Sequence, residues 1–281
     1  MNILSWNIIG LNDPNKVVGV KRLLRLHSVS IVGLLETKVK YHKVTALQKK
    51  FGSKWLWQCN YNHSTRGRIW LGWVDDLVNV TVLHVHEQFI HCFVTDKQMK
   101  NPIYLTVVYG LHTVETRRAL WRDLLSLVVT TSPWLLLGDF NSVLASSDRI
   151  NGAPISQYEI QDFEDFLLNA DVTEVQSSGF HFSWSNKGHG SARIASRIDR
   201  CLANQAWSQM FSHVMAKYLA PSVSDHSPVL VELLAAPSGG GRPFRFLNLL
   251  ADHEQFDPIV TECWSRHVPG TGLQCTPLGR G

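Results

Sequence analysis

The feature of the sequence that most limits its fold is a series of short apolar runs, each closed by a glycine or a polar residue. Residues 3–8 and 31–35 are predominantly apolar, and we expect them to form strands buried on both faces. Residues 78–86 alternate between valines and polar residues, which is typical of a half-buried strand. The same criteria predict further strands at residues 69–74, 89–95, 103–109, 134–138, 181–184, 197–202, 213–219 and 228–234.

Helical patterns lie between the predicted strands. One covers residues 17–27, behind the turn at Asp13-Pro14. A second has apolar residues at helical spacing on one face, namely Trp121, Leu124, Leu125 and Val128. A third begins with a capping box formed by Ser156 and Glu159, and its apolar stripe consists of Ile160, Phe163, Phe166 and Leu167. Because strands outnumber helices, we predict an α/β fold of two packed sheets with helices on their outer faces.

The composition fits a globular protein with a sizeable core. The chain has 281 residues, of which 44% are hydrophobic and 18% charged, and this excludes a disordered or fibrous chain. A formal net charge of +4 permits contact with a polyanion but does not by itself indicate one. Five scattered cysteines favour neither a disulfide framework nor a structural zinc site, and they suggest a reducing compartment.

The chain shows no membrane or export signal. Its apolar runs fall far short of the ~20 residues of a membrane span, and its N-terminus lacks a secretory signal. We therefore expect an intracellular protein that is not secreted and does not bind membranes. Residues 235–243 (AAPSGGGRP) predict a linker, which leaves residues 1–234 as the domain and 244–281 as a partly disordered tail.

The strongest local signal is Gly138-Asp139-Phe140-Asn141, directly after the predicted strand at 134–138. A strand end that presents an acid and an amide two residues apart directs both side chains toward one site at the sheet edge. A carboxylate beside a carboxamide suits a hydrated divalent cation and a phosphoryl oxygen. Asp139 and Asn141 also suit an ordinary β-turn, which is the alternative.

Two more motifs carry an acid or a histidine near a strand. In Ser224-Asp225-His226, Asp225 can bind a metal and His226 can act as a general base, since its ordinary pKa of ~6.5 allows proton transfer near neutrality. The alternative is a loop aspartate beside a half-exposed histidine. Asp199 can orient an imidazole, or it can form an ion pair with Arg197 or Arg200.

Three further polar residues lie at strand ends. Asn7 ends the first strand, and Glu36 follows the second. An acid after so apolar a run costs free energy unless it reaches the surface or pairs with a cation. Glu36 is therefore either a capping or solvent-facing residue or the principal metal ligand. Tyr109 ends the strand at 103–109, either as a core aromatic with a hydrogen-bonded hydroxyl or as a phosphate contact.

Taken in order, these motifs resemble the endonuclease/exonuclease/phosphatase superfamily, which includes deoxyribonuclease I, abasic-site endonucleases, sphingomyelinases and inositol polyphosphate phosphatases. The motifs are SWN, LLET, VVYG, GDFN, FSWSN, SRIDR and SDHSP, and they extend over residues 1–234. The longer segments SWNIIGLND, WLLLGDFNSVL and SRIDRCLAN are most similar to the endonuclease domain of LINE-type (non-LTR) retrotransposons, particularly plant ones. In such elements a segment like RPFRF leads toward a reverse transcriptase, so the tail resembles a remnant of that connection.

The resemblance implies a four-layered α/β sandwich like that of deoxyribonuclease I, and a DNA endonuclease that nicks one strand and leaves a 3′-hydroxyl. It implies Mg²⁺, or Mn²⁺ in its place, held chiefly by Glu36 with help from Asn7, Asp139 and Asp225. The implied catalytic residues are His226, Asp199, Asp139, Asn141 and Tyr109; His226 and Asp139 compete for the role of general base, while Asn141 and Tyr109 donate to phosphate oxygens. The expected contacts to DNA phosphates are Arg66, Arg68, Arg149, Lys187 and Arg193, although solubility charge is the simpler explanation for each alone.

One position departs from the pattern of abasic-site enzymes. Many of them carry an aspartate two residues after the first-strand asparagine, where this chain has Ile9. The change argues against a dedicated repair enzyme more than against activity. Two alternatives stay open: a phosphatase or phosphodiesterase of the same fold acting on lipid or inositol phosphates, and a catalytically silent nucleic-acid-binding remnant. We expect a monomer that binds DNA, needs no small-molecule cofactor, and is nuclear if it acts as a retroelement endonuclease.

Overall fold

The computed structural model describes residues 1–65, 67–98, 102–233, 258, 260–261 and 265. The chain divides into two units, Met1–Ala236 and Pro237–Gly281, and every element named below belongs to the first. The predicted linker at 235–243 lies outside the described residues, as do all but four residues of the predicted tail at 244–281.

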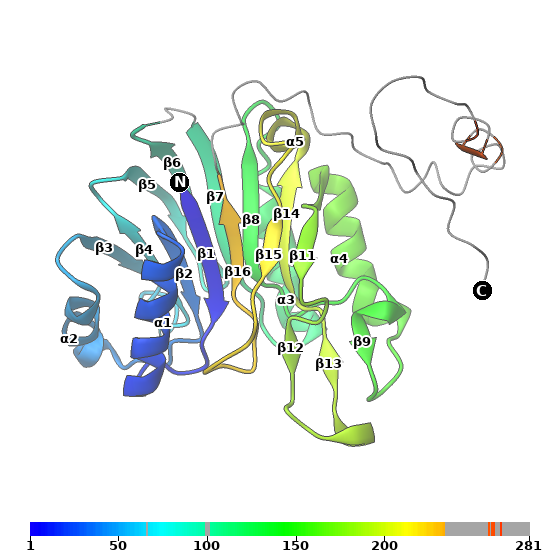
Figure 1. Cartoon of the computed structure of the whole chain (residues 1–281), viewed down its shortest axis with the longest axis horizontal. Coiled ribbons are helices and arrows are strands. Elements are labelled where there is room, and N and C mark those ends of the chain that lie inside the picture. Colours follow the sequence, from blue (N-terminus) through cyan, green and yellow to red (C-terminus); the bar gives the residue numbers. More distant parts are fainter. Residues whose placement is uncertain (66, 99–101, 234–257, 259, 262–264, 266–281) are drawn as a thin grey trace. The chain divides into compact units, whose positions relative to one another are not determined.

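Two large mixed sheets form the centre of the first unit (Figure 1). The strands of one are β1 (Asn2–Asn7), β2 (Ile31–Leu35), β3 (Trp55–Cys59), β4 (Ile69–Val74), β11 (Ser177–Gly179), β15 (Ala216–Tyr218) and β16 (Val229–Glu232), in the order β11-β15-β16-β1-β2-β4-β3. The strands of the other are β5 (Val78–Val85), β6 (Phe89–Asp96), β7 (Pro102–Tyr109), β8 (Trp134–Asp139), β10 (Val172–Glu174) and β14 (Asp199–Asn204), in the order β10-β14-β8-β7-β6-β5. A third, small sheet joins β12 (Trp184–Ser185), β13 (Ala195–Ser196) and β9 (Arg149–Ile150).

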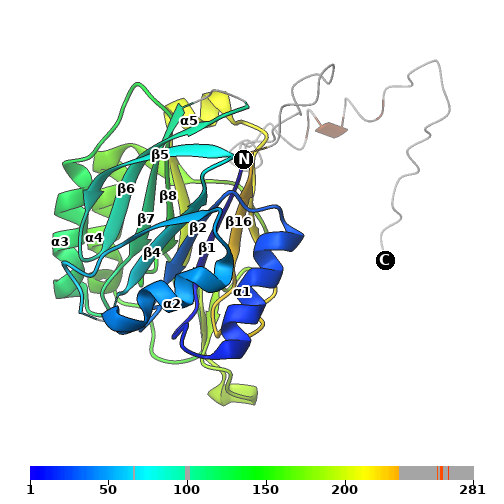
Figure 2. The ribbon, with the colours of Figure 1, turned by 90° about the vertical axis from the view of Figure 1, so that its left-hand side faces the viewer.

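Helices cover the outer faces of both large sheets (Figure 2). α1 (Pro14–Leu26) and α2 (Val44–Gln48) pack on the seven-stranded sheet, and α3 (Val114–Leu125) and α4 (Gln157–Ala170) pack on the six-stranded one. A short helix, α5 (Gln205–Met210), follows β14. Separate buried clusters lie between the two sheets and beneath each helical layer. The predicted four-layered sandwich is confirmed. Within the described part of the chain, no helix is long and apolar enough to span a membrane.

Local sequence signals determine where the helices begin. Asp13 caps α1, because its Oδ1 accepts a hydrogen bond from the Asn15 backbone N–H at 2.8 Å. In α4, the Glu159 carboxylate accepts from the backbone N–H of Ser156 at 3.0 Å, as the capping box predicts. α3 ends at Leu125, so the prediction that Val128 belongs to this helix was wrong. A β-branched run followed by Ser-Pro comes after Leu125, and such residues disfavour continuing the helix.

Several strand boundaries also differ from the sequence prediction. The strand predicted at 181–184 is only Trp184–Ser185, and those predicted at 197–202 and 213–219 are Asp199–Asn204 and Ala216–Tyr218. Strands β3, β9, β10, β11 and β13 were not predicted. Most of these have two or three residues, so their pairing partners rather than their own patterns define them.

Strand register brings distant polar residues to one place. The parallel pair β7–β8 sets Tyr109 beside Asp139, and the antiparallel pair β8–β14 sets Asp139 opposite Asp199. The parallel pair β1–β2 sets Asn7 beside Leu35, one residue before Glu36. Residues far apart in the sequence thus meet where these strands end.

Burial of His91 on β6 predicts a pH-dependent stability. Its Nδ1 lies 2.8 Å from Thr106 Oγ1, its ring stacks on Tyr104, and burial lowers its pKa to about 4 from 6.5. The unfolded chain takes up a proton here below pH 6.5 while the folded protein does not, so stability is full above pH 6.5 and falls as the pH drops toward 4. The contribution is at most roughly 3 kcal/mol. Urea unfolding at pH 7.5, 6 and 5 should show a weaker pH dependence for His91→Gln, and an unchanged dependence would contradict this assignment.

Candidate active site

Polar side chains from both large sheets meet in a cleft of about 320 Å³. Its charged and polar lining consists of Glu36, His112, Asp139, Asn141, Arg149, Ser196 and His226. Its apolar lining consists of Ile9, Trp184, Ile194 and Ile198. Five of the predicted site residues therefore line one cleft: Glu36, Asp139, Asn141 and His226, together with Arg149 of the predicted DNA contacts.

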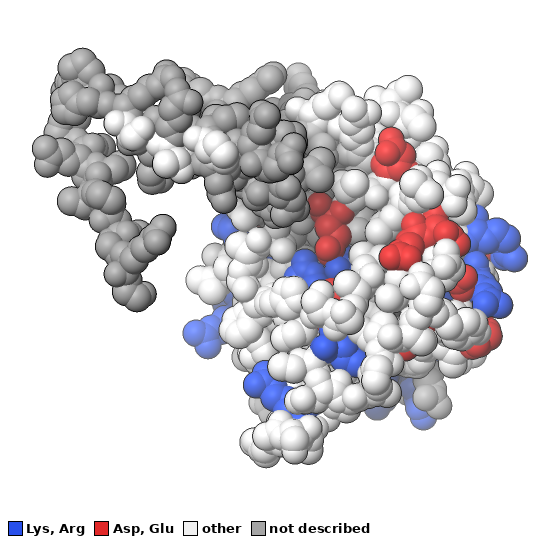
Figure 3. Space-filling model, turned by 90° about the vertical axis from the view of Figure 1, so that its right-hand side faces the viewer, with Lys and Arg blue, Asp and Glu red and all other residues white. Residues whose placement is uncertain are grey.

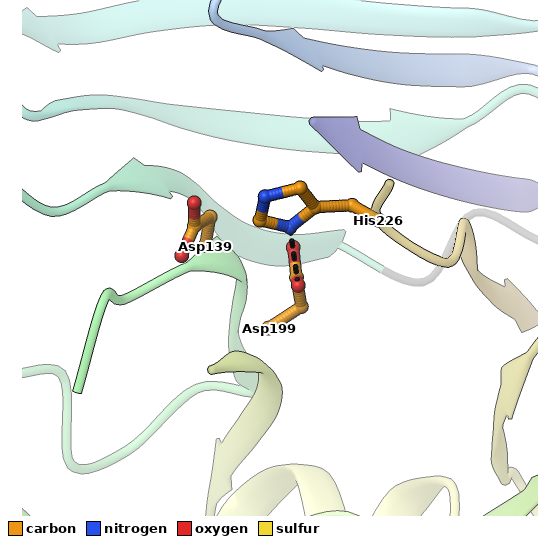
Figure 4. Close-up of side chains that lie close together, drawn as sticks. All are labelled: Asp139, Asp199 and His226. Carbon is orange, nitrogen blue, oxygen red and sulfur yellow. Dashed lines mark hydrogen bonds and ion pairs between the residues drawn. The ribbon is translucent and has the colours of Figure 1, made fainter. Parts of the chain in front are cut away.

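His226 and Asp199 form a buried pair (Figure 4). His226 Nδ1 lies 2.8 Å from Asp199 Oδ2, and the two residues are 3% and 2% exposed. The alternative of a half-exposed loop histidine is therefore wrong. So is the alternative ion pair of Asp199 with a neighbouring arginine, because Arg197 pairs with Glu174, and Arg200 with Asp148 and Glu174.

Asp139 lies beside this pair. Its Oδ1 accepts from the Asn141 backbone N–H at 2.9 Å, and its Oδ2 accepts from Asn7 Nδ2 at 2.9 Å. One ligand atom each of Asp139, Asp199 and His226 all lie within 4.8 Å of one another. Burial and the charge of Asp199 raise the pKa of Asp139 to about 7. Burial lowers the pKa of His226, but the charge of Asp199, with smaller contributions from Asp139 and Asp225, outweighs it and raises the pKa to about 9.

Glu36 follows β2 in a left-handed backbone conformation with a φ of 48°. Its Oε1 accepts from the Tyr109 hydroxyl at 2.7 Å, and its Oε2 lies 2.7 Å from Lys38 Nζ. Burial raises the pKa of Glu36, but the hydrogen bonds from Lys38 and Tyr109 outweigh it, so that the pKa lies below its usual value. Glu36 is thus a buried carboxylate paired with a cation, Lys38, which the sequence did not single out.

The side-chain hydrogen-bond donors of Tyr109 and Asn141 are already engaged with acceptors in the protein. Tyr109 donates its only hydroxyl proton to Glu36, while Asn141 Nδ2 donates to Gly110 O at 2.7 Å. His112 Nε2 lies 3.3 Å from the Tyr109 hydroxyl and must therefore be the donor in that contact. His112 is a site residue that the sequence analysis missed, since it lies in the loop after β7 and belongs to no motif.

The loop that carries His226 is tied to the first strand. Trp6 Nε1 donates to His226 O at 2.9 Å, and Ser224 Oγ donates to Asn7 O at 2.7 Å. Asp225 accepts from Trp184 Nε1 at 3.0 Å, so its carboxylate lies against the tryptophan that lines the cleft. The motifs SWN, FSWSN and SDHSP are therefore in mutual contact.

The donor set suits a hard divalent cation. Glu36 and Asp139 present carboxylate oxygen atoms, which Mg²⁺ prefers. Beside them, Asn7 Oδ1 accepts from the Ile9 N–H and Asn7 Nδ2 donates to Asp139. Asp139 is 1% exposed and, among the described residues, forms no ion pair with a lysine or arginine. A bound cation would offset the cost of keeping this buried carboxylate ionised.

The basic residues predicted to contact DNA differ in their position relative to the cleft. Arg149 lines it and pairs with Glu159 at 3.1 Å, and Arg68 lies over the Tyr109 ring at 5.9 Å. Lys187 and Arg193 are exposed in the connection between β12 and β13. Arg66 lies outside the described residues. On the face drawn in Figure 3, the lysine and arginine side chains that the structure describes are scattered rather than gathered in one broad patch.

A family model described as the endonuclease/exonuclease/phosphatase family matches residues 4–226. The chain belongs to this family. No curated protein matches the sequence.

Solved structures of the family share its fold. The AP endonuclease LMAP from Leishmania major has a TM-score of 0.64 at 14% identity, over 82% of this chain and 86% of that one. The endonuclease domain of TRAS1, a telomere-specific non-LTR retrotransposon, has a TM-score of 0.61 at 10% identity, over 82% and 96%. The 3′ phosphatase NExo from Neisseria, solved with a product DNA hairpin, has a TM-score of 0.59 at 21% identity, over 83% and 98%. At these identities the likeness shows the fold alone.

The contacts of Ser183 generate a prediction. Its buried Oγ accepts from the backbone N–H groups of Ile198 at 3.0 Å and Asp199 at 2.8 Å. Ser183→Ala leaves both donors buried without this partner, at a cost of about 1–3 kcal/mol each. We expect urea unfolding to show a loss of at least about 2 kcal/mol. Ser178→Ala, at an exposed position in β11, is the matched control and should lie within about 0.5 kcal/mol of wild type. Equal stability of the two variants would contradict the role of Ser183.

Proposed function

We propose that this protein is a Mg²⁺-dependent DNA endonuclease of LINE-type retrotransposon origin, which nicks one strand and leaves a 3′-hydroxyl. The buried Asp199–His226 pair beside Asp139, with Glu36 in the same cleft, carries this proposal. Family membership supports a hydrolase, since the similar structures named above are nucleases and a phosphatase. The DNA hairpin bound to one of them and the retrotransposon origin of another support DNA as the substrate.

The metal would be held by Glu36, with Asn7, Asp139 and Asp225 contributing. When bound, Mg²⁺ supplies a Lewis acid for the scissile phosphate. Lys38 and Tyr109 hold the Glu36 carboxylate ionised and in place, and Asn7 and Asn141 hold the Asp139 carboxyl group in place by hydrogen bonding.

His226 and Asp139 are the groups that would transfer protons in this site. Asp199 engages His226 Nδ1, which fixes the imidazole and leaves its Nε2 for a reacting water or phosphate oxygen. Asp139, with a pKa raised to about 7, and His226 are the two candidates for taking the proton of the attacking water. Because the pKa of His226 is raised to about 9, its imidazole is a cation near neutrality and would there hold a phosphate oxygen. Tyr109 and Asn141 act here by positioning the two carboxylates, because their donors are engaged with the protein.

The cleft favours a DNA phosphodiester over a lipid or inositol head group. Arg149 is the only arginine or lysine in its described lining, and it is already paired with Glu159. A multiply phosphorylated head group needs several free cations in one pocket. Of the other basic residues, Lys187 and Arg193 are exposed and Arg68 pairs with Glu87 at 3.7 Å. None of the three lines the cleft, which suits contacts to DNA phosphates outside it.

Metal dependence gives the decisive experiment. Supercoiled plasmid should be nicked in Mg²⁺ but not in EDTA, and DNA ligase should reseal the nick if it leaves a 3′-hydroxyl and a 5′-phosphate. Glu36→Gln should lower nicking at limiting Mg²⁺ by at least about 10- to 100-fold, because it weakens a metal ligand. Glu164→Gln, at an exposed position on α4, is the matched control and should nick like wild type.

Other outcomes separate the alternatives. Hydrolysis of inositol phosphates without nicking would support the phosphatase, and DNA binding without any hydrolysis would support the silent remnant. Either result would overturn the proposed function.

The Asp199–His226 pair predicts non-additive losses. His226→Ala and Asp199→Ala should each lower the nicking rate by about 10² to 10⁴-fold, and the double variant should fall little further, since the two residues act as a unit. DNA affinity measured in Ca²⁺ should stay near the wild-type value. Losses that multiply independently would show that the pair is structural.

A further inference from the structure

The chain takes an unfavourable backbone conformation directly after β1. Ile9 has a φ of 44°, in the left-handed region that β-branched residues rarely adopt. Ile9 also lines the active-site cleft. Such a conformation persists only where surrounding contacts hold it.

Lys16 supplies the strongest of them. It lies in the first turn of α1, and its Nζ donates to Ile8 O at 2.8 Å and to Ile9 O at 2.7 Å. Two of the three ammonium donors are thus used on consecutive carbonyl groups. The next residues are tied to the loop of Glu36, because Gly10 N–H donates to Glu36 O and Leu11 N–H to Thr37 O, both at 2.7 Å.

The conformation of Ile9 determines how the Asn7 amide faces. The Ile9 N–H donates to Asn7 Oδ1 at 3.2 Å, which identifies this end of the amide as the oxygen. The nitrogen end is thereby directed to Asp139, and Asn7 Nδ2 donates to Asp139 Oδ2 at 2.9 Å. A continuous series of contacts leads from Lys16 through Ile9 and Asn7 to Asp139.

We propose that Lys16 is a positioning residue of the active site: it clamps the Ile8 and Ile9 carbonyls, holds Ile9 in the left-handed conformation, and so orients Asn7 toward Asp139. The catalytic consequence rests on the proposed function, whereas the clamp itself can be measured without activity. Lys16 needs no contact with substrate to act in this way.

The test combines loss of the clamp with relief of the strain. Lys16→Met removes both hydrogen bonds, and we expect kcat for nicking to fall by about tenfold or more with little change in KM, because the strained conformation is no longer favoured. Adding Ile9→Gly to this variant should restore most of the lost kcat, since glycine adopts a positive φ at little cost. Lys21→Met, on the same helix, removes an equal charge and should behave like wild type.

A second measurement is independent of catalysis. The side-chain amide signals of Asn7 in a ¹H–¹⁵N NMR spectrum, assigned with Asn7→Ala, should shift in Lys16→Met and return toward wild type when Ile9→Gly is added. If the wild-type protein nicks no DNA, the proposed function fails while this spectrum still decides on the clamp. If Lys16→Met does not fold, Lys16→Gln, which keeps a shorter N–H donor, takes its place.

Two results would overturn the proposal. One is an unchanged Asn7 signal in Lys16→Met. The other is a raised KM with weaker salt dependence that Ile9→Gly does not correct, which would make Lys16 a phosphate contact rather than a positioning residue.

Discussion

The structure depends on holding two carboxylates, Asp139 and Asp199, opposite each other on paired strands where water has little access. Burial and mutual repulsion both oppose their ionisation. The protein offsets this cost with the His226 imidazole on Asp199 and with hydrogen bonds from Asn7 and Asn141 on Asp139. A site built in this way tolerates little displacement, and the surrounding fold accordingly provides several independent supports.

The two-sheet sandwich is the first support. Apolar side chains of both sheets fill the space between them, so that the strands are fixed along most of their length. The polar side chains of the site lie where strands end, at Asn7, Tyr109 and Asp139, or where the next loop starts, at Glu36. The core thus sets the positions of the site residues without containing their charges, apart from the compensated pair.

Contacts between loops are the second support. The SWN segment holds the His226 loop through Trp6 and Ser224, and Ser183 holds the start of β14 through two backbone N–H groups. The segment after Asn7 is paired with the Glu36 loop and clamped by Lys16. Several residues of the short motifs therefore serve other motif residues rather than the substrate. This explains why serine and tryptophan recur beside the acids and the histidine.

Helix and strand patterns determined much of the architecture. The predominantly apolar runs that become β1, β2 and β8, and the capping signals of α1 and α4, are local properties, because burial periodicity and helix caps act within a few residues. They were sufficient to predict two sheets with helices outside. They also placed Asn7, Glu36, Tyr109 and Asp139 at strand ends, where the structure has them.

Tertiary structure alone decided which side chains and which strands pair with each other. Asp199 had two arginines as sequence neighbours, yet it bonds to His226 because strand register carries the arginines to Glu174 and Asp148 instead. Lys38 and His112 entered the site through loop conformations that no periodic pattern encodes, and the short strands β9 to β13 exist only through partners elsewhere in the chain. The sequence by itself determined which residues have the chemistry and where most of the longer strands lie. The pairing of those segments decided the geometry, because hydrogen bonds between residues 26 to 220 positions apart are set by the packing of the whole domain.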